Sequence, residues 1–200
     1  MNEHWLASVW PVAQQPAREQ RRGRYLPESA AHPGKMLPAL ARHAIEAFSA
    51  PTELVLDPMC GIGTTLVEAA HLGRRAVGVE LEPRWAALAA ANLEHARRQG
   101  ATGRGLVIRG DARRLGAGLL DELRGRVSLI VTSPPYGSSL HGQLHTRPDG
   151  IETYDDRYSH NPENLAQLPQ RRPRGSRPTF AGALTEILAG CTNTRPPRRR

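Results

Sequence analysis

Apolar residues along this chain follow two patterns that alternate. Short continuous apolar runs predict buried strands, at residues 54–57, 75–80, 106–111 and 127–132. Apolar residues at helical spacing predict helices at 36–49, 64–72, 83–99 and 180–189, with a short helix or helical turn at 115–123. Strands that are separated by helices form βαβ units, so the sequence predicts an α/β fold with a mostly parallel sheet.

Two stretches lack this periodicity. Residues 1–30 are polar and contain proline, and they predict an extended arm over the domain surface or a poorly ordered terminus. Residues 138–178 are rich in Pro, Arg, His, Asn and Asp, and they predict a long loop rather than a simple connection. We therefore expect four parts, which are the arm 1–30, a core 31–137, the loop 138–178, and a helix with a basic tail at 179–200.

The net charge of +8 indicates a polyanionic partner. Much of this charge lies in residues 170–200, where eight arginines face one acid, so the tail either contacts nucleic acid or is only solvated. A second basic cluster spans Arg18 to Arg24. No apolar run approaches 18 residues and no signal peptide is recognisable, so we expect no membrane span. With only two cysteines, no disulfide framework is implied, and a cytoplasmic location is expected.

The turn after the first strand is the strongest chemical signal. It contains DPMCGIGTT, in which Gly61 and Gly63 let the backbone approach a ligand, because glycine has no Cβ and tolerates positive φ. The helix that begins at Thr64 directs free N–H groups toward the same place. Asp57 can accept a hydrogen bond from an ammonium group. The spacing is not the G-x-G-x-x-G of a dinucleotide site, because no third glycine follows.

Two further acids end the second and third predicted strands. Glu80 follows Asp57 by 23 residues, about where an α/β nucleotide site places its ribose-binding carboxylate. Asp111 could accept a hydrogen bond from an adenine amino group. Either acid could instead cap a helix N-terminus. Since ligands bind at the carboxyl ends of parallel strands, all three acids are expected at one edge of the sheet.

The fourth predicted strand runs into Ser133-Pro134-Pro135-Tyr136, which could be an ordinary turn. At the end of the fourth strand, the tetrapeptide also suits methylation of an aromatic amino group, whose lone pair is delocalised into the ring. The Ser133 hydroxyl and the Pro134 carbonyl can accept hydrogen bonds from such a group, and the two prolines stiffen the turn beforehand. Tyr136 can stack on an extruded base.

Taken in order, the glycine turn, Glu80, Asp111 and SPPYG resemble S-adenosylmethionine-dependent amino-methyltransferases of nucleic acids, from about His32 to Gly137. The resemblance implies a Rossmann-like methyltransferase fold with strand order 3-2-1-4 and S-adenosyl-L-methionine as cofactor, and it places the turn at 32–36 near the cofactor's methionine end. It implies no metal. The implied cofactor-binding residues are Asp57, Pro58, Met59, Cys60, Gly61, Gly63, Thr64, Glu80 and Asp111. The implied catalytic residues are Ser133, Pro134, Pro135 and Tyr136.

The substrate stays open between three alternatives. Serine at the first tetrapeptide position is common among DNA cytosine-N4 methyltransferases, so we expect DNA and this base. The same motifs are similar to tRNA guanosine-N2 methyltransferases, which usually carry Asp at that position. The third alternative is an inactive paralogue that only binds nucleic acid. The family's sheet has seven strands where four are predicted here, so we expect a C-terminally incomplete fold with the fourth strand as an exposed edge.

Overall fold

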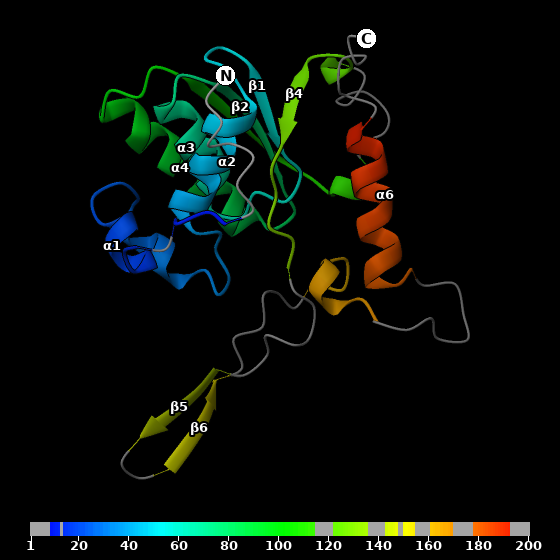
Figure 1. The fold of residues 1–200 in the computed structure, drawn as a ribbon. Helices are drawn as coiled ribbons and strands as arrows, with labels where there is room; N and C mark the ends of the chain where they lie inside the picture. Colours follow the sequence, from blue (N-terminus) through cyan, green and yellow to red (C-terminus); the bar gives the residue numbers. More distant parts are fainter. Residues whose placement is uncertain are drawn as a thin grey trace.

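The computed structural model describes residues 9–12, 14–114, 122–135, 143–147, 150–154, 161–169 and 178–192. Its main sheet has four strands, all parallel, in the order β3-β2-β1-β4 (Figure 1). The strands are β1 (Leu54–Asp57), β2 (Arg75–Glu80), β3 (Arg104–Arg109) and β4 (Val127–Ile130). The predicted Rossmann-like α/β fold and the predicted strand order are both confirmed, with β4 at the sheet edge.

Two strands differ from the prediction in their bounds. β3 begins and ends two residues early, so Gly110 and Asp111 lie beyond it, although the Gly110 N–H still donates to the Glu80 carbonyl at 2.9 Å. β4 ends at Ile130, and one further bond, from the Val131 N–H to the Leu56 carbonyl at 3.0 Å, continues its pairing with β1. These bonds keep the residues after each strand at the carboxyl edge of the sheet.

Helices cover both faces of the sheet (Figure 1). On one face lie α2 (Pro38–Phe48), α3 (Thr64–His71) and α4 (Pro83–Arg98), and on the other lies α6 (Phe180–Thr192). β1 shows the two-residue alternation that this requires, because Val55 packs with the first group whereas Leu54 and Leu56 pack with Ile187 of α6. The sheet edge that holds the predicted site is therefore built on a core buried from both sides.

Residues 14–31, the larger part of the predicted arm, do not form an extended arm. They contain α1 (Ala17–Arg21) and the 3-10 helix η2 (Pro27–Ala31), and they pack on α3 and α4. Tyr25 is only 4% exposed. Arg24 forms two hydrogen bonds to the buried carboxylate of Glu68, at 2.7 and 2.6 Å, so this member of the basic cluster neutralises an internal acid.

The stretch 138–178 is more structured than the predicted loop. Strands β5 (Gln143–Arg147) and β6 (Gly150–Tyr154) form an antiparallel hairpin, and the 3-10 helix η5 (Leu165–Gln167) follows. A further 3-10 helix, η3 (Ala112–Arg114), comes directly after β3. Most of the predicted helix at 115–123 and the last eight residues of the tail lie outside the described residues, and the four domain boundaries stay predictions. Within the described ranges, no helix has the length and apolarity needed to cross a bilayer.

Candidate active site

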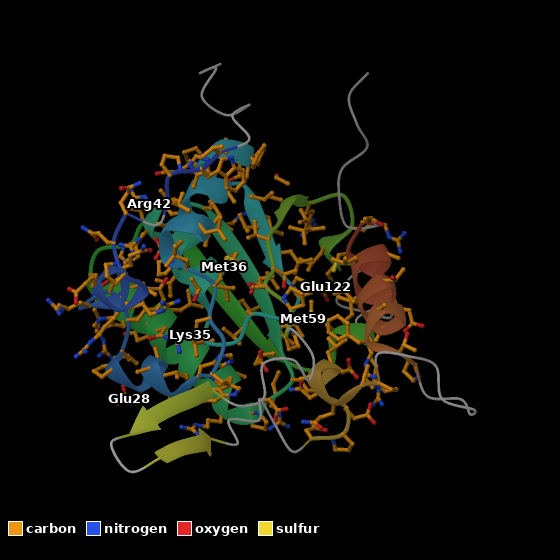
Figure 2. All side chains as sticks on the ribbon, turned by 60° about the horizontal axis from the view of Figure 1, so that its bottom comes forward. Glu28, Lys35, Met36, Arg42, Met59 and Glu122 are labelled. Carbon is orange, nitrogen blue, oxygen red and sulfur yellow. The ribbon has the colours of Figure 1, made fainter. Side chains whose placement is uncertain are left out.

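A pocket with about 840 Å³ of empty space, which includes the solvent at its open mouth, lies at the carboxyl ends of the strands. Figure 2 looks onto this end of the molecule and labels three lining residues, Lys35, Met36 and Met59. Most of the predicted site residues line it, namely Asp57, Pro58, Met59, Cys60, Gly61, Thr64, Glu80, Asp111, Ser133 and Pro135. Gly63 and Pro134 are not among the lining residues, and Tyr136 lies outside the described residues.

The glycine turn adopts the conformation that its sequence predicts. Gly61 and Gly63 have φ of +53° and +81°, and Gly63 is the N-cap of α3. A Cβ added at Gly61 would lie 3.2 Å from Nε2 of His32, which also lines the pocket. The Gly61 N–H donates to Oε2 of Glu80 at 2.8 Å, which ties the turn to the end of β2. A side chain at Gly61 would therefore crowd His32 in the pocket lining.

Asp57 and Glu80 are carboxyls whose ionisation is opposed by their surroundings. Burial raises the pKa of Asp57 to about 6, and the Met59 N–H, which donates to Oδ1 at 3.1 Å, offsets part of this shift. The Thr65 and Thr132 hydroxyls lie close enough to lower it further, although neither meets hydrogen-bond geometry. Burial likewise raises the pKa of Glu80 to about 7, against N–H donation from Glu82 and Gly61. Such carboxyls suit a ligand that brings its own ammonium and hydroxyl donors.

The raised pKa of Glu80 predicts how stability depends on pH. Between its ordinary value of 4.5 and about 7, the folded chain holds the Glu80 proton more tightly than the unfolded chain does. Folding stability from this group therefore falls as pH rises through that window, and the penalty is complete above pH 7. Glu80→Gln removes the titration. The difference in unfolding free energy should shift by about 2 kcal/mol in favour of the variant between pH 5 and 7.

Urea unfolding of the wild type and of Glu80→Gln at several pH values measures this difference. Parallel stability curves for the two proteins across pH 5 to 7 would contradict the raised pKa. Asp57 titrates in the same range in both proteins, so its own burial penalty is common to the two curves.

Asp111 is engaged in a way that the sequence did not reveal. Its carboxylate accepts from Nε and Nη2 of Arg113, at 3.0 and 2.6 Å, and from the Arg113 backbone N–H at 2.9 Å. Burial opposes ionisation of Asp111, but the hydrogen bonds from Arg113 outweigh burial and lower its pKa. The backbone bond at the start of η3 corresponds to the capping alternative. To accept from an adenine amino group, the Asp111 carboxylate would have to do so while it stays paired with Arg113.

Sequence reasoning missed several lining residues. They are Glu82, Trp85, Arg113, Glu163, Asn164, Leu165 and Ile187. The His32 ring packs edge-on against Trp85, with ring centroids 4.6 Å apart, and thereby joins the predicted turn at 32–36 to the start of α4. Trp85 could have been found from its place in the first turn of the helix after Glu80. Residues 163–165 carry no such signal, because they lie in a stretch without periodicity.

The chain has recognisable relatives. Residues 1–91 match the DNA methylase family. The chain is 41% identical over 109 residues to the tRNA (guanine(10)-N2)-dimethyltransferase of Methanothermobacter thermautotrophicus, a match covering 54% of this chain and 30% of that protein. It is 36% identical over 67 residues to the type II methyltransferase M.ScaI of Streptomyces caespitosus, covering 34% of this chain and 22% of that protein. This chain thus spans about a third or less of the length of these curated relatives.

Among solved structures, a candidate DNA modification methylase of Thermus thermophilus, in complex with S-adenosyl-L-methionine, is 37% identical. That match covers 48% of this chain and 44% of the other, with a TM-score of 0.32. The sequence matches confirm the resemblance of the chain to amino-methyltransferases of nucleic acids, and S-adenosyl-L-methionine is the cofactor that this resemblance implies.

Proposed function

We propose that this chain carries the site of an S-adenosylmethionine-dependent enzyme that methylates an exocyclic amino group of a nucleic acid. One observation carries the proposal, which is that Ser133 and Pro135 line the same pocket as the glycine turn and Glu80. Residues 76 positions apart in the chain, Asp57 and Ser133, meet there because β1 and β4 are neighbours in the sheet. Cofactor-binding and base-holding groups therefore face one shared space.

The residues divide the work by position. When bound, S-adenosyl-L-methionine supplies an electrophilic methyl group. Asp57 is placed to accept from the cofactor's ammonium group, and Glu80 from its ribose hydroxyls, once both are ionised. The Ser133 hydroxyl and the Pro134 carbonyl accept hydrogen bonds from the target amino group and draw its nitrogen toward tetrahedral geometry. The role of Tyr136, stacking on an extruded base, stays a prediction.

We propose DNA as the substrate and cytosine-N4 as the target. The match of residues 1–91 to the DNA methylase family supports DNA, and serine at position 133 favours the cytosine amino group. A tRNA guanosine-N2 activity is the second candidate, and the longer, 41% identical match to a tRNA methyltransferase favours it. A paralogue that binds nucleic acid without turnover is the third.

Methyl transfer from labelled cofactor to DNA and, separately, to tRNA decides between these candidates. Digestion and identification of the modified nucleoside should yield N4-methylcytosine from DNA. N2-methylguanosine from tRNA would support the second candidate instead. Cofactor binding without transfer to either nucleic acid would support the third, and absence of cofactor binding would contradict the proposal.

Ser133→Ala tests the catalytic half of the site. Losing one hydrogen-bond partner of the reacting nitrogen should lower kcat by about a hundredfold, the lower end of the cost of removing one such transition-state contact. The affinity for S-adenosylhomocysteine should stay nearly unchanged, since the lost interaction acts mainly in the transition state. Single-turnover rates and calorimetry measure the two quantities.

Ser128→Ala provides the matched control, because Ser128 lies in β4 but does not line the pocket. It should leave both quantities at wild-type values. Normal turnover by Ser133→Ala would mean that the tetrapeptide is only a turn.

A further inference from the structure

We propose that Arg113, Glu163 and Asn164 are positioning residues that hold segment 161–169 against the pocket as a second wall over the cofactor. We call the contacts of Asp111 with Arg113, Arg113 with Glu163, and Glu82 with Asn164 the clasp. The inference rests on the proposed function, because the cofactor is the ligand that the wall would enclose.

Arg113 links two acids that come from distant parts of the chain. Its Nη2 lies 2.6 Å from Oδ2 of Asp111 and 2.6 Å from Oε2 of Glu163, and it also donates to the Glu163 carbonyl at 3.1 Å. The guanidinium and the Asp111 carboxylate are mostly buried, whereas the Glu163 carboxylate is 50% exposed. Without the cation between them, the two carboxylates would repel each other at this distance. Segment 161–169 is thus held in place by the positive charge of Arg113, which lines the pocket.

Asn164 makes the second link. Its Nδ2 donates to Oε1 of Glu82 at 3.0 Å, while its Oδ1 accepts from the Ala166 N–H at 3.0 Å. Both ends of the amide are used, so its orientation is set. The Glu82 N–H in turn donates to Oε1 of Glu80 at 2.9 Å, so the clasp reaches the carboxyl proposed to hold the ribose.

Apolar contacts anchor the segment from behind. Leu165 and Leu168 are buried in the cluster that contains Leu56 of β1 and Ile187 of α6. In Figure 1, the segment (orange) lies near the carboxyl end of the sheet, beside the start of α6. Leu165 and Ile187 line the pocket together with Glu163 and Asn164. The segment therefore packs on the core through its leucines, and the clasp holds its polar residues, Glu163 and Asn164, at the pocket.

This arrangement couples the clasp to the ligand. A ligand that contacts both the glycine turn and segment 161–169 binds more tightly when the clasp contacts are formed than when they are broken. By linkage, such a ligand stabilises the clasp, and the clasp strengthens binding of the ligand by the same free energy. Loosening the clasp should accelerate dissociation of the cofactor more than it changes the chemical step.

Glu163→Gln tests the proposal with the smallest change of shape. We expect the Kd for S-adenosylhomocysteine to rise about tenfold, through faster dissociation, and the KM for S-adenosyl-L-methionine to rise in parallel with kcat unchanged. Arg113→Lys, which keeps the charge but loses the fork, should have a smaller effect of the same kind. Glu94→Gln is the matched control, since Glu94 forms exposed ion pairs with Arg97 and Arg98 on α4, away from the pocket.

Limited trypsin digestion gives an independent readout on the full chain. S-adenosylhomocysteine should protect residues 161–178 of the wild type, whose arginines at 171 and 174 are cleavage sites, and should not protect Glu163→Gln. Tight binding by the wild type that Glu163→Gln and Arg113→Lys both leave unchanged would overturn this inference alone. A wild type that does not bind S-adenosylhomocysteine would overturn the proposed function, and this inference with it.

Discussion

Gly61→Val should lower the affinity for S-adenosylhomocysteine by about a hundredfold or more, while the protein still folds. Gly61 has φ of +53°, which costs a residue with a side chain about 1–2 kcal/mol. Its Cβ would lie 3.2 Å from Nε2 of His32, so the His32 ring would have to shift. Gly61 and His32 both line the pocket, so the added side chain and the displaced ring should take up space that the ligand needs.

Gly125→Val separates the loss of ligand space from backbone strain. Gly125 has φ of +69° and nothing within 4 Å of an added Cβ, so this variant shares the strain but not the obstruction. Both variants should lose unfolding free energy through the shared strain, and only Gly61→Val should lose binding by calorimetry. A folded Gly61→Val protein that binds with wild-type affinity would refute this location for the cofactor.

Arg24→Ala should lower the unfolding free energy by about 3 kcal/mol, because it leaves the carboxylate of Glu68 buried without its cation. Glu68 is 2% exposed, and Arg24 contacts both of its oxygens. Tyr25 would remain as a hydrogen-bond donor to Oε1, at 2.7 Å, which keeps the loss at the lower end for buried pairs. Because Glu68 lies in α3, directly after the glycine turn, the variant should also loosen the cofactor pocket.

Arg22→Ala is the control for this prediction. Arg22 pairs with Glu19 at 2.6 Å, the same distance as between Arg24 and Glu68, but its side chain is 71% exposed. Exposed pairs contribute about 0–1 kcal/mol, so its removal should be nearly neutral. Denaturant unfolding of the two variants measures the contrast. Equal losses would show that burial of Glu68 does not make the Arg24 ion pair special.

The N-terminal basic cluster illustrates a limit of reading charge from sequence. Four arginines near one another suggest a surface for phosphates, and Arg22 is exposed as that reading requires. Arg24 instead reaches Glu68, 44 residues away, and Arg21 donates to the Met36 carbonyl at 2.5 Å. A partner this far along the chain leaves no local pattern, so the sequence cannot distinguish a structural arginine from one that is available to a ligand.

Asn92 shows the same limit for an uncharged residue. It lies on the apolar side of α4 in the sequence pattern and is fully buried in the structure. There its Oδ1 accepts from the Leu26 N–H, and its Nδ2 donates to the Ile62 carbonyl within the glycine turn. The N-terminal segment and the cofactor turn are therefore joined through one amide, which no periodicity could have indicated.

The sequence by itself determined the elements and the edge at which they converge. Strand and helix positions follow from local periodicity, the glycine turn from its own residue types, and the meeting of Asp57, Glu80 and Ser133 from the rule that parallel strands present their carboxyl ends together. Only the tertiary structure decided which acids are paired with other side chains and which segments enclose the pocket. Arg113 with Glu163, and Glu82 with Asn164, are separated by 50 and 82 residues, and side chains so far apart become neighbours only when the sheet and α6 have packed.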